Sequence, residues 1–210
     1  MRLLFLILVL LSLSAKSQST LDYKLYSIAL DSYFAKLNNT NKSFKQIIVI
    51  CDYTPVSNYA WQYGAEFFAN SDDSKNFKLH YDTALIRLLR IDSVKSGLIQ
   101  LETDFFTAQV LESSQFETKI PVTTIKYRKY KRFFKSLLGK SIERGWEKFY
   151  KKYPASFGSF KFSKVVYSAD YAFFYIGHQA GRLYGSGDII ILKQESNNWR
   201  IVNYINVWQS

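Results

Sequence analysis

The C-terminal quarter of the chain constrains the fold most, because it consists largely of β-rich runs. β-Branched and aromatic residues dominate four segments, residues 162–167, 171–178, 188–194 and 199–208. Turn-forming residues lie between the first and second runs, at 168–170, and between the third and fourth, at 196–198. Short turns join antiparallel neighbours, so the sequence predicts a four-stranded antiparallel meander within residues 160–210.

Helical periodicity dominates the segments before this sheet. Ser19 is suited to cap a helix over residues 20–37, whose apolar residues recur at helical spacing. Residues 46–53 are rich in β-branched residues and indicate one extra N-terminal strand. The remaining expectations are helices over residues 81–91 and 98–108 and an extended segment over residues 116–125. Residues 54–80 show no clear pattern.

Positive charge is concentrated in a basic helical segment, residues 126–153. The chain has a formal net charge of +11, and residues 119–152 contain twelve basic and two acidic residues. Apolar residues on either side of Gly139 predict two amphipathic helices, the second ended by Pro154. Aromatic residues alternate with cations in the first, a pattern that suits anion binding, although a solvated face is the alternative. The candidate anion-binding residues are Lys126, Arg128, Lys129, Lys131, Arg132 and Lys135.

These patterns together predict an α+β fold. Residues 18–210 are expected to form a single domain, in which helices cover one face of the C-terminal sheet. Helices on a curved sheet are also found in the nuclear transport factor 2 superfamily, and that comparison is an analogy of architecture only.

The first 17 residues have the pattern of an export signal. Arg2 precedes an unbroken apolar run from Leu3 to Leu11, and Ala15 and Ser17 are small residues suited to a signal peptidase. The run is shorter than the roughly 20 residues that span a bilayer as a helix. We therefore expect cleavage before Gln18 and an exported protein, periplasmic or secreted, that does not span the membrane.

Cysteine and histidine are scarce in this chain. Cys51 is the single cysteine and lies in a β-rich run, so no internal disulfide can form and a buried thiol is expected. His80 and His178 are the only histidines, which is too few for a metal site rich in histidine or cysteine. We expect packing alone to stabilise the fold, with no metal and no cofactor.

A glycine-rich segment, residues 177–187, contains four of the nine glycines. One interpretation is a ligand loop in which four side chains surround an anionic or sugar-like group; these are His178, Arg182, Tyr184 and Ser186. The other is a long connection between two strands. Spacing alone does not support a catalytic trio of Ser186 and His178 with Asp188 or Asp170, so no catalytic residue is assigned.

Several C-terminal motifs resemble a group of small exported bacterial proteins of unassigned function. They are the block GWEKFYKKYP at residues 145–154, the tetrapeptide FSKV at 162–165, the glycines of residues 181–187 and the closing segment 199–210. The glycine loop of that group often has the form Cys-Gly-Gly-Leu-Cys-Gly-Ser-Gly. Ala180 and Tyr184 replace the two cysteines here. The resemblance implies an exported globular protein and supplies no activity, catalytic residue or cofactor.

The sequence therefore favours a non-catalytic exported protein that binds an anionic or carbohydrate-like partner. Acidic polysaccharide, lipopolysaccharide and acidic protein are the candidate partners, and export argues against nucleic acid. An exported hydrolase that uses the glycine-rich segment is the second hypothesis. A structural or assembly protein of the cell envelope is the third.

Overall fold

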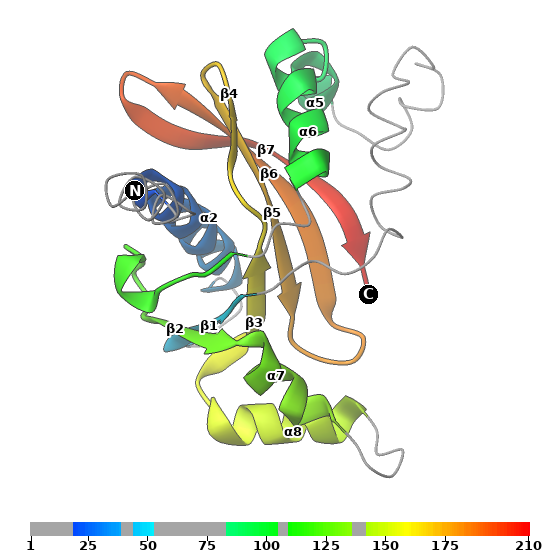
Figure 1. The fold of residues 1–210 in the computed structure, drawn as a ribbon. Coiled ribbons are helices and arrows are strands. Elements are labelled where there is room, and N and C mark those ends of the chain that lie inside the picture. Colours follow the sequence, from blue (N-terminus) through cyan, green and yellow to red (C-terminus); the bar gives the residue numbers. More distant parts are fainter. Residues whose placement is uncertain (1–18, 39–43, 53–82, 105–108, 136–141) are drawn as a thin grey trace, which may run out of the picture.

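A computed structural model of the chain describes residues 19–38, 44–52, 83–104, 109–135 and 142–210 (Figure 1). The expected leader, the unpatterned segment 54–80 and the predicted break near Gly139 lie outside these ranges. Within the described ranges, none of the helices combines the length and the apolar character that crossing a membrane requires.

One mixed sheet organises the fold. Its strands follow the order β2-β1-β3-β5-β6-β7, and β4 also pairs with β5. The bounds are β1 Gln46–Cys51, β2 Val122–Lys126, β3 Ser156–Phe162, β4 Val166–Ser168, β5 Tyr171–Gln179, β6 Gly185–Glu195 and β7 Asn198–Gln209. β1 is parallel to β2 and β3, whereas the other pairs are antiparallel. The α+β class and the C-terminal antiparallel meander are thus confirmed.

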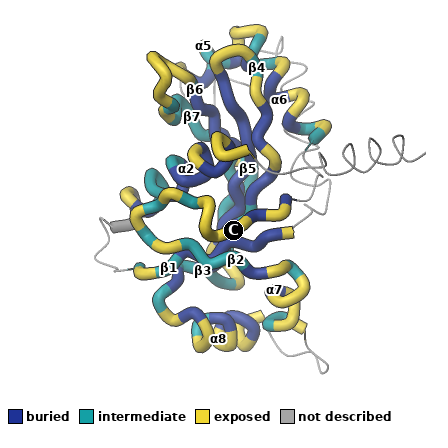
Figure 2. The backbone as a smooth tube through the Cα atoms, turned by 60° about the vertical axis from the view of Figure 1, so that its left-hand side comes forward, coloured by how far each residue is buried: buried dark blue, intermediate teal, exposed yellow. Residues whose placement is uncertain are grey.

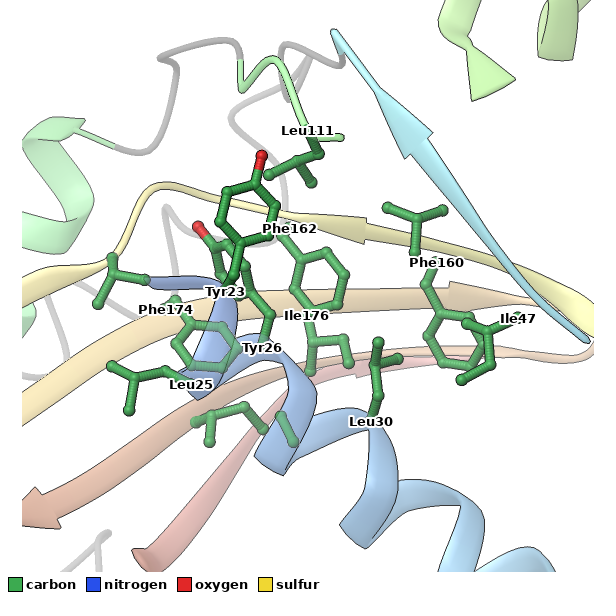
Figure 3. Close-up of a cluster of buried hydrophobic side chains, with 14 of the residues drawn as sticks. Tyr23, Leu25, Tyr26, Leu30, Ile47, Leu111, Phe160, Phe162, Phe174 and Ile176 are labelled. Carbon is green, nitrogen blue, oxygen red and sulfur yellow. The ribbon is translucent and has the colours of Figure 1, made fainter. Parts of the chain in front are cut away.

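Helix α2 (Thr20–Asn38) covers one face of the sheet (Figures 1 and 3). Its first turn is capped as predicted, because the Asp22 amide donates to Ser19 Oγ at 3.1 Å and the Ser19 amide donates to Asp22 Oδ2 at 3.3 Å. Tyr26 is fully buried against Phe162, and its hydroxyl donates to the Ser163 carbonyl at 2.8 Å. Burying a side chain of this size stabilises the fold by about 2–3 kcal/mol.

Two pairs of helices cover the opposite face. Helices α5 (Thr83–Leu88) and α6 (Asp92–Asp104) pack on one end of it, against Phe173 and Ile191. Helices α7 (Tyr127–Phe134) and α8 (Ile142–Lys152) pack on the other end, against Ile48 and Ile50 of β1. Figure 2 shows buried residues along β5 and β6 and exposed residues on the outer sides of α7 and α8. The sheet is therefore a central layer between helices.

Several element boundaries differ from the sequence prediction, among them those of β3, β4 and α6. The run 162–167 is not one strand, because β3 ends at Phe162 and β4 begins at Val166. Strand β3 begins at Ser156, directly after α8, where the sequence analysis placed no strand. Helix α6 begins at Asp92 rather than at residue 98. Gly97 lies inside this helix, although glycine has a low helix propensity. An added Cβ at position 97 would overlap the Phe173 ring, so close packing against β5 explains the glycine.

Ser159 provides a small test of the sheet's packing. Its side chain is 1% exposed, and its Oγ finds no hydrogen-bond partner in the described part of the chain. A buried hydroxyl without a partner is destabilising, so Ser159→Ala is expected to raise the free energy of unfolding by about 0.5–1 kcal/mol. Urea unfolding of both proteins measures the difference, and a loss of stability would show that the hydroxyl has a stabilising partner.

Candidate functional site

A cavity of about 1080 Å³ opens between α7, α8 and the sheet. Its described lining is strongly basic, with Asp52 as the single acidic residue. The cationic lining residues are Arg128, Lys131, Arg132, Lys135, Lys161 and Arg182. The aromatic ones are Tyr127, Tyr130, Phe134 and Trp146. The volume lies just above the usual range for small-ligand sites, so the cavity can admit an extended ligand.

Helical spacing explains how α7 supplies three of these cations. Arg128, Lys131 and Arg132 follow one another at intervals of three and one residues, which keeps them on one side of the helix axis, and Lys135 directly follows the last residue of the helix. Asp52 holds the start of this helix, because the Tyr127 amide donates to Asp52 Oδ1 at 2.6 Å. A carboxylate is favourable at a helix N-terminus. The end of β1 therefore fixes the direction of the basic helix.

Strand alternation brings two polar residues of the sheet to the floor of the cavity. Phe160 and Phe162 of β3 face α2, so Lys161 between them faces α7 and α8. Ser159 pairs with Gln179 of β5, which places Gln179 diagonally across from Lys161 on the same face. Lys161 Nζ donates to Gln179 Oε1 at 3.4 Å, and the Tyr130 hydroxyl donates to the same oxygen at 3.3 Å.

Lys161 differs in environment from the cations of α7. Lys161 is half-buried, with its Nζ 5.6 Å from the centroid of the Tyr130 ring, whereas Arg128, Lys131 and Arg132 are exposed to solvent. Burial disfavours the charged ammonium and lowers the pKa of Lys161 to about 8. Lys161 therefore loses its proton more readily than an ordinary lysine.

The glycine-rich segment is mostly strand. β5 continues to Gln179 and β6 begins at Gly185, which leaves residues 180–184 as the connection. Gly177 and Gly187 pair directly across the two strands. An added Cβ on Gly187 would overlap the Trp208 ring, whose Nε1 donates to the Tyr175 hydroxyl at 2.9 Å. Glycine at position 187 thus makes room for Trp208.

The connection 180–184 is attached to α8. The Tyr150 hydroxyl donates to the Ala180 carbonyl at 2.8 Å, and burial raises the pKa of Tyr150 to about 12. Arg182 Nη1 lies 3.0 Å from Glu143 Oε1 in an exposed ion pair. Such a pair contributes little stability, but it keeps Arg182 at the edge of the cavity.

His178 faces α2, on the side of the sheet opposite to the cavity. It is 2% exposed, and its Nε2 donates to the Phe157 carbonyl at 2.7 Å. Since a carbonyl only accepts, Nδ1 carries the lone pair and accepts from the Tyr33 hydroxyl at 2.9 Å. Burial lowers the pKa of His178 to about 4, so the ring is neutral at neutral pH. Both ring nitrogens are therefore engaged: Nδ1 links β5 to α2, and Nε2 links β5 to β3.

The structure separates the predicted site residues into two groups. Four of the six candidate basic residues line the cavity, whereas Lys126 and Lys129 do not. Of the candidate loop residues, Arg182 joins them there. Ser186 pairs with His178 across β5 and β6, and Tyr184 lies edge-on to the His178 ring, with centroids 6.2 Å apart. These three residues do not line the cavity.

Four cavity residues escaped the sequence analysis, namely Asp52, Trp146, Lys161 and Gln179 as lining groups. Trp146 is one of the buried residues of α8 and is 7% exposed. Lys161 and Gln179 come from β3 and β5, and Asp52 directly follows β1; nothing in their local sequence marks them. Only the pairing of β1, β3 and β5 brings them together.

Within the described ranges, no three His, Cys, Asp or Glu side chains are grouped as metal ligands would be. Comparisons with protein-family models, with curated proteins and with solved structures found no match to this chain.

Proposed function

We propose that this chain is an exported, non-catalytic protein that binds an acidic polysaccharide of the cell envelope in the cavity between α7, α8 and the sheet. One observation carries the proposal: Arg182 of the 180–184 connection, three cations of α7 and Lys135 at its end line the same cavity as Trp146 and Tyr130. The exported location rests on the pattern of residues 1–17.

The chemistry of the lining supports an anionic carbohydrate. Several cations around one concavity raise the local potential and attract an extended polyanion. Arg128, Arg132 and Arg182 can each offer a planar pair of donors to a carboxylate or sulfate. The half-buried rings of Tyr127 and Phe134 supply apolar surface, against which the faces of sugar rings can pack.

The alternative of an exported hydrolase has less support. His178 and Ser186 lie opposite each other on β5 and β6, but neither lines the cavity. Both ring nitrogens of His178 already have partners, so the ring is not placed to take a proton from a nucleophile.

Neutralising the cavity is expected to weaken binding strongly. We expect a triple variant, Arg128→Gln, Lys131→Gln and Lys135→Gln, to bind a heparin oligosaccharide at least about tenfold more weakly, because each residue supplies a cation to the lining. Isothermal titration calorimetry at two salt concentrations measures this change. Affinity of the unaltered protein is expected to fall as salt rises.

A second triple variant is the matched control. Lys129→Gln, Lys148→Gln and Lys151→Gln remove the same charge from exposed residues of α7 and α8 that do not line the cavity. This control should retain most of the affinity. Equal losses in the two variants would assign binding to net charge alone and would overturn the proposed site.

A further inference from the structure

We propose that Lys161 is a carbonyl-reactive lysine, which captures negatively charged aldehydes or ketones as a reversible imine. The inference rests on the proposed function, because the cations of the cavity must first hold the anionic group. It extends that function from electrostatic binding to covalent capture of a defined class of ligand.

The position of Lys161 is the first observation that supports this proposal. It is half-buried on β3 at the floor of the cavity, while Arg128, Lys131 and Arg132 are exposed on α7. An anionic group bound by the α7 cations therefore lies above the amine. A carbonyl on the same molecule can then approach Nζ. The entropy cost of positioning the ligand is already covered by the binding of its anionic group.

The surroundings of Lys161 supply the second part of the argument. Its Nζ donates a hydrogen bond to the neutral amide oxygen of Gln179 and lies over the Tyr130 ring. Burial lowers the pKa of this amine to about 8, so roughly one molecule in ten holds the neutral amine at pH 7. The neutral amine is the nucleophile, and lysines desolvated in this way form imines.

The reaction is a balanced condensation. The Nζ lone pair attacks the carbonyl carbon, and a proton passes from nitrogen to the oxygen to give a carbinolamine. The hydroxyl then leaves together with the remaining proton on nitrogen as water, and the nitrogen lone pair forms the C=N bond. No oxidant or reductant takes part, and addition of water reverses the step.

Labelling with pyridoxal 5′-phosphate, an aromatic aldehyde that carries a phosphate, tests the proposal. After borohydride reduction, peptide mass spectrometry at pH 7.5 should find Lys161 modified about tenfold faster than exposed lysines such as Lys148. Lys161→Arg keeps the charge and should lose this label, whereas Lys148→Arg should leave it unchanged. The triple variant Arg128→Gln, Lys131→Gln and Lys135→Gln should slow labelling of Lys161 several-fold.

Two outcomes separate this inference from the proposed function. If the heparin oligosaccharide binds and protects the cavity but Lys161 is labelled no faster than Lys148, the carbonyl chemistry is wrong and anion binding stands. If the oligosaccharide does not bind the unaltered protein, the proposed function fails. Rapid labelling of Lys161 that is unchanged in the triple variant would refute the role of the cations in delivering the aldehyde.

Discussion

Replacing Gly158 with alanine is expected to lower the free energy of unfolding by about 3–4 kcal/mol, because the residue combines a left-handed backbone with a closed environment. Gly158 has φ +71°, which a residue with a side chain rarely adopts. An added Cβ would also overlap the carbonyl oxygen of Gln179, a backbone atom of β5 that cannot move without disturbing its strand. Urea unfolding and thermal melting measure the effect.

The bulge in β3 explains why the chain has this strain-prone position. Gln46 of β1 pairs with Ser156 and Ile48 pairs with Ser159, so β3 holds one more residue than β1 between these pairs. Gly158 lies in that extra length, next to Phe157, whose carbonyl accepts from His178. The bulge therefore decides which side chains of β3 point to each face of the sheet, and it places Lys161 on the cavity side.

Gly181→Ala is the matched control for Gly158→Ala. The Cβ added at Gly181 would lie 3.5 Å from Tyr184 Cβ, an ordinary contact, so its effect should stay within about 0.5 kcal/mol. Similar stabilities of the two variants would show that Gly158 does not pack against the Gln179 carbonyl as described.

Acidification is expected to destabilise the protein through His178. The pKa of His178 is about 4 in the folded protein and 6.5 in the unfolded chain. Between these values the unfolded chain binds the proton and the folded protein does not, so stability falls as the pH falls from 6.5 to 4. The complete shift corresponds to about 3 kcal/mol.

The variant His178→Gln isolates this contribution. A glutamine amide can still donate to the Phe157 carbonyl and accept from the Tyr33 hydroxyl, but it does not titrate. From pH 7 to pH 4.5 the unaltered protein should lose about 2 kcal/mol more stability than the variant, and carboxylates titrate in both and cancel. Denaturant unfolding at both pH values measures the loss. Parallel losses would mean that the His178 ring is protonated in the folded protein without penalty.

Local patterns predicted the elements whose own residues specify them. Helix α2 has a capping residue, Ser19, and a wide apolar stripe, and both act within one segment. The strands β5, β6 and β7 have either alternating apolar and polar residues or a continuous apolar run, and turn-forming residues flank them. Each strand could therefore be recognised from its own residues. β3 was missed because Gly158 interrupts its run of Phe157, Phe160 and Phe162, a run of aromatic residues that could have indicated a strand.

One helix brings most of the candidate basic residues to the cavity, whereas the sheet adds lining residues that the sequence analysis did not name. The basic face of α7 follows from helical spacing alone. The glycine-rich segment was interpreted as one loop, yet His178 and Gln179 are consecutive residues that face opposite sides of β5. Strand geometry makes that separation unavoidable, because successive side chains alternate between faces.

The sequence by itself determined the α+β class, the antiparallel C-terminal meander and the concentration of charge on α7, because each depends on residues close together in the chain. Only the tertiary structure decided that Lys161 and Gln179 lie beneath the α7 cations and that His178 lies against α2. The physical reason is the pairing of β1 with β3 and of β3 with β5. The register of those pairs joins residues far apart in the sequence, and the bulge at Gly158 sets which side chains of β3 face the cavity.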